Sequence, residues 1–234
     1  MTKIVSEFNG GLPNIRVNIH RDDGSMQLKD LTAVEYFSLL RDVFYEHVTM
    51  PAARLGALPD GFYDAAISGT PDSYTCAVCL EPGRVSAIYF DKEYVVPYPK
   101  LLLVYKVLRG SLVGTRCFAL KRNDVLDDNV KLYKYPFGNV DDDGSVCWGG
   151  NSRNLIGERK FNSLHDLNFL SVLFVSSPSN GDYFTPDRIN NFAPSLSDFY
   201  RELGSMDVFP DECLSPIGGH YNLGSFLNDW RCLL

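Results

Sequence analysis

The stretch that most constrains the fold is residues 74–120, where apolar runs alternate with tight-turn signals. Leu101–Tyr105 reads Leu-Leu-Leu-Val-Tyr, and such a continuous apolar run predicts a strand that is covered on both faces. Leu101–Leu108 and Leu112–Leu120 flank the turn residues Arg109-Gly110-Ser111, which predicts a β-hairpin. The chain is therefore predicted to be built around an antiparallel β meander.

The segments beside this hairpin are less regular. Tyr74–Leu80 and Arg84–Phe90 flank Glu81-Pro82-Gly83, which predicts a second hairpin. Residues 50–73 carry proline and glycine with little periodicity, so they are predicted as loop. Residues 121–161 contain acidic turns and glycines and are predicted to be irregular.

Helical patterns lie on both sides of the meander. The first begins with a capping-box pattern in which Thr32 is followed three residues later by Glu35. The second has Ser163 as its N-cap. Strands with helices before and after them indicate the α+β class. The predicted helices span Thr32 to about His47, Ser163–Val175, Ser195–Leu203 and Leu223–Leu234.

No linker clearly divides the chain, so it is predicted to be a single domain, residues 1–234. Asn14–His20 alternates apolar and polar residues ahead of the turn signal Asp22-Asp23-Gly24, which predicts a β ribbon. Ser176–Pro194 contains three prolines and is predicted as a long surface loop. The predicted parts are a β-ribbon extension at 1–30, a core at 74–175, and a loop with C-terminal helices at 176–234.

Composition and charge exclude some classes of function. The 234 residues are 45% apolar and 13% aromatic, which is typical of a folded chain rather than a disordered one. The net charge of −7 and the absence of a basic cluster disfavour nucleic acid as the ligand. No signal peptide or membrane span is predicted, so a cytoplasmic protein with free thiols is expected. The cysteines are Cys76, Cys79, Cys117, Cys147, Cys213 and Cys232.

The segment 135–150 contains the residues that are most suited to catalysis. Asp143-Gly144 is a strong signal for chain reversal. A three-residue loop at 142–144, with glycine in the left-handed position, places Asn139 opposite Cys147. The sequence therefore predicts a carboxamide beside a thiol.

A thiol with a neighbouring amide is suited to acyl transfer. A thiolate attacks a carbonyl to form a thioester, an amine later attacks the thioester, and both steps pass through an oxyanion. An amide donor placed at the oxyanion stabilises it by about 3 to 4 kcal/mol. Because Cys147 can receive its cargo by exchange from another thioester, no histidine is needed close to it in the sequence.

The segment resembles the active-site motif of ubiquitin-conjugating enzymes, which runs His-Pro-Asn-Ile, three variable residues, Gly, one variable residue, Ile or Val, and the catalytic Cys. Residues 139–147 reproduce this pattern from the asparagine onward, whereas Phe137 and Gly138 occupy the His and Pro positions. The wider stretch 97–150 is similar to protein B of the PRTRC cassette, a prokaryotic ubiquitin-conjugating-like family (family D).

This resemblance implies an α+β fold of the ubiquitin-conjugating (UBC) type, with a ubiquitin-like modifier protein and a ThiF-type activating enzyme as partners. It implies that Cys147 carries the thioester and that Asn139 supports the oxyanion. Asp143, Gly144 and Trp148 would belong to the active-site loop. No metal or cofactor is implied. The family's histidine is mainly structural, so its replacement bears on loop geometry more than on chemistry.

Two alternatives remain open at this point. The chain could be a UBC-like module that docks the modifier or the activating enzyme without catalysis. It could also be a Cys-His hydrolase, if His165 or His220 approaches Cys147 in space. Asp141–Asp143 is predicted as a solvated turn whose charges disfavour a free thiolate. Trp148 is predicted to anchor the loop to the core.

Overall fold

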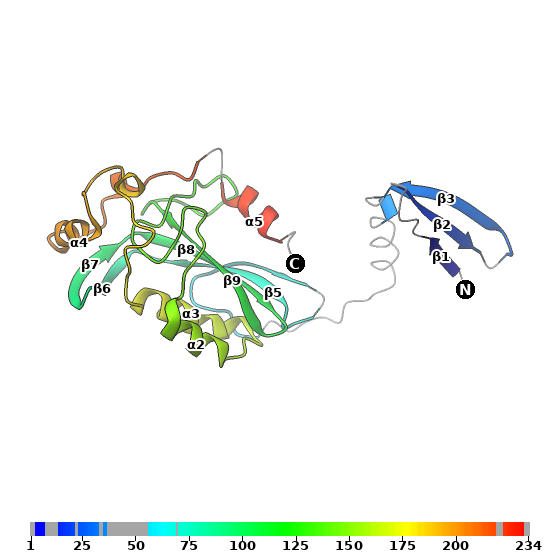
Figure 1. Ribbon diagram of the computed structural model, residues 1–234, viewed down its shortest axis with the longest axis horizontal. Coiled ribbons are helices and arrows are strands. Elements are labelled where there is room, and N and C mark those ends of the chain that lie inside the picture. Colours follow the sequence, from blue (N-terminus) through cyan, green and yellow to red (C-terminus); the bar gives the residue numbers. More distant parts are fainter. Residues whose placement is uncertain are drawn as a thin grey trace. The chain divides into compact units, whose positions relative to one another are not determined.

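The computed structural model describes residues 3–7, 14–21, 23–32, 35–36, 56–68, 70–218 and 222–231. The contacts divide the chain into two units, Met1–Ala53 and Arg54–Leu234 (Figure 1). The sequence prediction placed everything in one domain with residues 1–30 as an extension, whereas the contacts group residues 1–53 as a unit of their own.

The first unit contains a three-stranded antiparallel sheet, as the alternating pattern predicts. Its strands are β1 (Lys3–Glu7), β2 (Asn14–His20) and β3 (Met26–Thr32), in the order β1-β2-β3. Gly24 takes the left-handed conformation in the turn between β2 and β3 (φ 82°), which glycine adopts without steric cost.

The predicted capping box after β3 is present. The Thr32 N–H donates to Glu35 Oε2 at 2.8 Å, and the Glu35 N–H donates to Thr32 Oγ1 at 3.3 Å. These reciprocal bonds satisfy two backbone donors at a helix start. The rest of the helix predicted to reach His47 lies outside the described residues.

The second unit contains two antiparallel sheets. The four-stranded sheet has the order β4-β5-β8-β9, and β6 and β7 form a separate pair. The strands are β4 (Phe62–Ile67), β5 (Tyr74–Leu80), β6 (Gly83–Tyr89), β7 (Lys92–Tyr98), β8 (Lys100–Leu108) and β9 (Ser111–Leu120).

The hairpin predicted around Arg109-Gly110-Ser111 is confirmed, since β8 pairs with β9. The hairpin predicted around Glu81-Pro82-Gly83 is wrong. The β5 residues are almost all buried, and β5 pairs with β4 on one side and β8 on the other, so no edge remains for β6. Strand β6 instead pairs with β7 through Phe90 and Asp91, which both have positive φ.

Two further predictions of irregular structure are corrected. Residues 50–73, predicted as loop, contain β4, a half-buried edge strand. Residues 121–161 contain the helix α2 (Gly149–Gly157) after the acidic turn. Both elements gain their stability by packing on a neighbouring strand rather than from local periodicity.

The continuous run Leu101–Tyr105 is buried on both faces, as predicted, because the central sheet has a core on each side. Leu101, Leu103 and Tyr105 belong to one cluster of buried residues. Leu102 and Val104 belong to the other. Helices α2 and α3 lie on one side of the sheet and α5 on the other (Figure 1).

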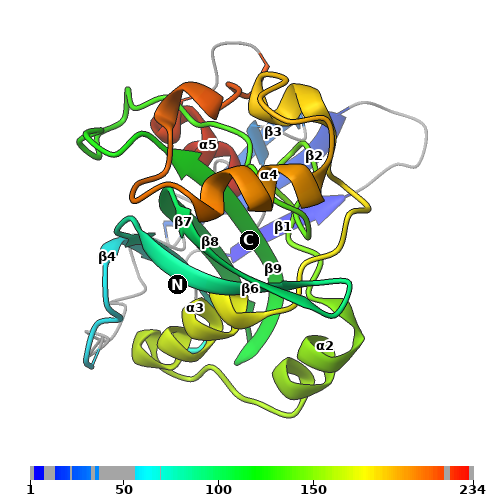
Figure 2. The same cartoon turned by 90° about the vertical axis from the view of Figure 1, so that its left-hand side faces the viewer.

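The remaining predicted helices are present. They are η1 (Leu164–Asp166) leading into α3 (Leu167–Ser176), α4 (Leu196–Gly204) along β7, and α5 (Leu223–Arg231) (Figure 2). Ser195 caps α4 by accepting the Asp198 N–H at 3.1 Å. No helix among the described residues is long and apolar enough to cross a membrane.

The segment Ser176–Pro194 is not only a surface loop. It contains the short helix η2 (Pro186–Ile189), in which Arg188 and Ile189 are buried. A second short helix, η3 (Asp211–Cys213), follows α4. The short helix η2 therefore packs on the core, although prolines and polar residues surround it in the sequence.

Candidate active site

The chain reverses between Asn139 and Cys147 as the sequence predicts. The Cys147 N–H donates to the Asn139 carbonyl at 2.7 Å, so the two residues lie opposite each other. Val140 and Val146 form an antiparallel bridge inside this pair. Gly144 has φ 84°, the left-handed conformation expected of a glycine in this loop.

Gly144 is needed for a second reason, which is the close approach of the core. A Cβ atom at this position would lie 2.5 Å from a ring carbon of Phe118. The loop therefore packs its backbone directly on the central sheet. Any side chain at residue 144 would displace the reversal that aligns Asn139 with Cys147.

Asp141 organises the turn from within. Its Oδ1 accepts the N–H of Asp143 at 3.0 Å and that of Ser145 at 2.9 Å. Burial and the neighbouring Asp143 carboxylate raise the pKa of Asp141. Burial acts against ionisation of Asp143 too, but hydrogen bonds with Asp141 and Ser145 and the charge of Arg116 outweigh it and lower the pKa of Asp143.

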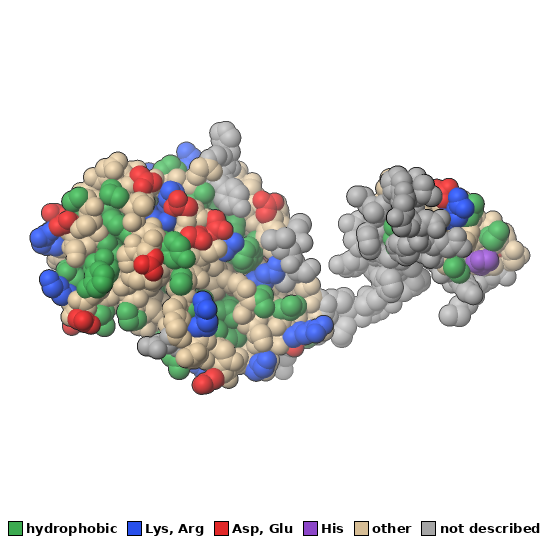
Figure 3. Space-filling view, in the orientation of Figure 1, with side chains coloured by type: hydrophobic (Ala, Val, Ile, Leu, Met, Phe, Trp, Pro, Cys, Tyr) green, Lys and Arg blue, Asp and Glu red, His purple; other side chains and the backbone are tan. Residues whose placement is uncertain are grey.

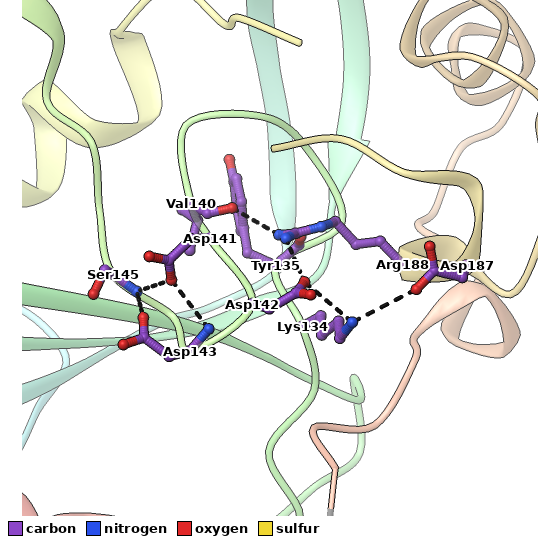
Figure 4. A network of polar contacts seen from close by, with 9 residues as sticks. All are labelled: Lys134, Tyr135, Val140, Asp141, Asp142, Asp143, Ser145, Asp187 and Arg188. Carbon is purple, nitrogen blue, oxygen red and sulfur yellow. Dashed lines mark hydrogen bonds and ion pairs between the residues drawn. The ribbon is translucent and has the colours of Figure 1, made fainter. Parts of the chain in front are cut away.

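Asp142 and Asp143 are exposed, as the prediction of a solvated turn requires, and both carboxylates also pair with cations. Asp142 lies 2.7 Å from Arg188 Nη2 and 3.1 Å from Lys134 Nζ (Figure 4). Asp143 lies 3.2 Å from Arg116 Nη2. Because nearby cations offset these charges, the turn presents less negative potential to the thiol than the sequence alone suggests.

Arg188 holds the loop from the protein interior. Its side chain is 2% exposed, and Nη1 donates to the carbonyls of Val140 at 2.8 Å and Tyr135 at 3.1 Å (Figure 4). Burial lowers the pKa of Arg188, and Asp142 opposes that effect. The sequence does not predict this role, because nothing local distinguishes a buried arginine in a proline-rich polar stretch from a surface residue.

Asn139 takes the left-handed conformation (φ 68°), and its carboxamide contacts the segment after α3. Asn139 Nδ2 donates to the Pro178 carbonyl at 2.7 Å, and Oδ1 accepts the Asn180 N–H at 2.9 Å. A Cβ atom on Gly138 would lie 1.6 Å from the Asn180 carbonyl oxygen. Residues 178–180 are thus fixed against the loop that carries Asn139.

Cys147 is the one described cysteine that is not buried. It is partly exposed and lines a hollow of about 180 Å³ together with Asn139. The other lining residues come from the start of α2 and from the segment after α3: Trp148, Gly149, Gly150, Ser152, Ser177, Pro178 and Asn180.

The other described thiols are buried, as expected for core residues. Burial raises the pKa of Cys76 to about 12 and that of Cys79 to about 11. It also raises the pKa of Cys117 and of Cys213. These thiols remain protonated at neutral pH and are shielded from reagents.

Trp148 joins the thiol to the core. Its indole Nε1 donates to Thr115 Oγ1 at 3.3 Å, and its ring meets Phe174 edge-on at 6.1 Å between centroids. Phe137, at the position where the resembled motif has histidine, is 4% exposed and stacks on Tyr200 with 5.4 Å between ring centroids. Aromatic packing therefore fixes both flanks of the loop.

No described histidine lines the hollow at Cys147. His165 lies on η1 rather than in the hollow, and His220 lies outside the described residues. Among the residues that the structure describes, no group of three or more His, Cys, Asp or Glu side chains is placed to hold a metal ion. The arrangement offers a thiol and an amide, which are the groups of cysteine acyl transfer.

The fold and site define an α+β protein with an accessible cysteine on a reversed loop beside its antiparallel sheet. Residues 73–179 match the family model described as prokaryotic E2 family D, and this match confirms the family resemblance predicted from the sequence. The matched segment contains both Asn139 and Cys147 and ends before Arg188. Neither a curated protein nor a solved structure matches the chain.

Proposed function

We propose that this protein is a ubiquitin-conjugating-like acyltransferase of UBC-like fold with Cys147 as its nucleophile. The Cys147 thiolate attacks the carbonyl carbon of a thioester held by the activating enzyme. The new carbon–sulfur bond forms at Cys147, the bond to the donor sulfur breaks, and the donor leaves as a thiolate. An amine then attacks the Cys147 thioester, forms an amide and releases the Cys147 sulfur, while the amine proton goes to solvent.

The observation that carries this proposal is the exposure of a single described thiol opposite Asn139. Cys147 is partly exposed and lines a hollow, whereas the described cysteines of the core are buried. The family match covers the loop that presents it. In this proposal the partners are a ubiquitin-like modifier and a ThiF-type activating enzyme, since the cysteine needs an activated acyl group.

The role of Asn139 follows from its second amide hydrogen. One hydrogen of Nδ2 is used by the Pro178 carbonyl, and Asn139 borders the same hollow as Cys147. In the proposal, the remaining hydrogen stabilises the oxyanion of the tetrahedral intermediate. Asn139 thus both fixes the segment 178–180 and supports the reaction.

A reconstitution tests the proposal. The full chain is mixed with ATP, a ThiF-type activating enzyme and a ubiquitin-like modifier, and the products are separated without reducing agent. We expect a band that thiol removes and that Cys147→Ala abolishes. Cys147→Ser is the matched control, because an oxyester on serine survives the thiol. A thiol-sensitive band that persists in Cys147→Ala would overturn the proposal.

Asn139 needs variants that respect its left-handed backbone. Asn139→Gly keeps that conformation and removes the carboxamide, whereas Asn139→Ala adds strain at φ 68°. We expect Asn139→Gly to load Cys147 and to discharge to an added amine at least tenfold more slowly. Equal discharge rates in Asn139→Gly and the unchanged protein would remove the carboxamide from the mechanism.

A docking role is the second candidate, and the replacement of the motif's His and Pro by Phe137 and Gly138 favours it. In that case the protein binds the modifier or the activating enzyme, and the reconstitution gives no thiol-sensitive band. Size-exclusion chromatography of the same mixture separates the two candidates, since a stable complex without the band supports docking.

A further inference from the structure

The central sheet has an open edge next to Cys147. Strand β9 is the last strand of the order β4-β5-β8-β9, so one of its sides has no strand neighbour. The far half of this side is covered, because Arg116 bridges Ser145 and Ala119 bridges Tyr133. Among the described residues, none pairs with this side of Ser111–Gly114.

A hollow of about 310 Å³ runs along this open edge. It is lined by four consecutive β9 residues, 112–115, and by residues of α2 and of the strand segment that leads to the thiol. Leu112, Trp148 and Ile156 give it apolar walls, and Val113 is 55% exposed at its rim. Its lining suits an extended peptide that pairs with the edge and inserts one apolar side chain.

The hollow lies next to the one that contains Cys147. Trp148 lines both this hollow and the one that contains Cys147. The Val146 N–H donates to the Thr115 carbonyl at 3.1 Å, so the residue before Cys147 already pairs with β9. From Thr115 to Val113 is about 7 Å along the strand. A chain whose terminal carbonyl lies at the sulfur therefore reaches the open edge within a few residues.

The charges near the open edge indicate that the docked segment is acidic. Three cations lie near the open edge: Arg153 lines the hollow, Lys160 donates to Ser111 Oγ at 3.1 Å, and Arg109 is in the adjoining turn. None of them forms an ion pair with a carboxylate of a described residue. Figure 3 shows Lys and Arg side chains on this end of the second unit.

We propose that the open edge of β9 binds the extended C-terminal segment of the acyl-donor protein, with acidic residues of that segment facing these cations. This inference rests on the proposed function, since it needs an acyl chain that ends at Cys147. The segment adds a short antiparallel or parallel strand at Ser111–Gly114 and crosses Trp148 to the thiol. A glycine at the C-terminus of the segment lets its terminal carbonyl approach the Cys147 sulfur.

The test uses the full chain and two thioesters of known composition. One is N-acetylglycine thioester, which has no peptide to dock. The other is an eight-residue peptide thioester that ends in glycine and has alternating valine and glutamate upstream. Mass spectrometry follows acylation of Cys147. We expect the peptide thioester to react at least tenfold faster, and a peptide with lysine in place of glutamate to lose that advantage.

Variants locate the effect. Val113→Asp and Arg153→Glu change exposed side chains that line the hollow, and each is expected to reduce the peptide's advantage at least threefold. Lys92→Glu is the matched control, because Lys92 is exposed on β7. All variants should react alike with N-acetylglycine thioester. Full retention of the advantage in both Val113→Asp and Arg153→Glu would overturn the inference.

A binding measurement keeps the two proposals apart. The same peptide as a carboxamide cannot acylate, and its binding should slow hydrogen exchange of the backbone amides in 111–114. Reaction of both thioesters at equal rates without this protection leaves the acyltransferase in place and removes the docking edge. Protection without acylation of Cys147 supports the docking edge and removes the acyltransferase. Protection by an amine-bearing acceptor peptide instead of the donor peptide overturns the assignment to the donor.

Discussion

The buried arginine of η2 allows a sharp prediction about the loop that carries Cys147. Arg188→Met keeps an unbranched apolar stem and removes the guanidinium that donates to Val140, Tyr135 and Asp142. The stem continues to fill its place in the core. The change therefore isolates the polar contacts of the guanidinium.

The magnitude follows from what the substitution leaves unpaired. The two carbonyls lose a charged donor, and each such loss costs about 1 to 2 kcal/mol. Asp142 is 67% exposed and keeps Lys134, so its lost ion pair adds little. The buried Arg188 Nε has no partner in the structure, and removing it returns about 1 kcal/mol. We expect the second unit to lose about 2 kcal/mol of unfolding free energy.

Urea unfolding followed by tryptophan fluorescence measures this directly, because Trp148 and Trp230 both lie in the second unit. Arg201→Met is the matched control, since Arg201 is 69% exposed and pairs with Asp198 on its own helix. That variant should change stability by no more than about 0.5 kcal/mol. Equal, small effects of the two substitutions would refute the view that Arg188 holds the loop.

Three further predictions concern the packing of the site and its thiols. Gly138→Ala should destabilise the protein by about 2 kcal/mol or more and slow acylation, because its Cβ would overlap a backbone oxygen, whereas Gly204→Ala meets no atom within 4 Å and should be tolerated; thermal melts compare the two. Iodoacetamide at pH 7.5 should modify Cys147 at least tenfold faster than the four buried thiols. Peptide mapping identifies the labelled residues, and labelling of a buried thiol before Cys147 would contradict this prediction. The free energy of unfolding should fall as pH rises from about 9 to 11, because thiols such as Cys79, whose folded pKa is about 11, lose their protons at lower pH in the unfolded chain. Each such thiol contributes a slope of at most about 1.4 kcal/mol per pH unit. Urea titrations at several pH values measure the slope, and Cys117→Ala should reduce it.

Local chemistry explains which strands could be predicted. The β8–β9 hairpin has glycine and serine in its turn and apolar strands on both sides, so the pattern and the structure agree. The β6–β7 turn uses Phe90 and Asp91 at positive φ, where glycine or asparagine is the usual signal. The sequence therefore favoured the more conspicuous Glu81-Pro82-Gly83, which instead connects two different sheets.

The same distinction applies to the site. The reversal from Asn139 to Cys147 was predictable because Asp143-Gly144 encodes it within a few residues. The contacts of Arg188 with Tyr135 and Val140 span 53 and 48 residues. No short-range pattern encodes such contacts, and an arginine that is buried by distant carbonyls has the same local sequence as an exposed one.

Long-range contacts also explain how Phe137 and Gly138 fit where the resembled motif has His and Pro. Phe137 stacks in an aromatic cluster, and Gly138 lets the Asn180 backbone approach to a distance that no side chain permits. Arg188 donates to the Val140 carbonyl in the same loop. Asn180 and Arg188 both follow residue 179, where the family match ends. Residues that follow the matched segment thus hold the loop, so the geometry at Cys147 depends on contacts that lie outside the family match.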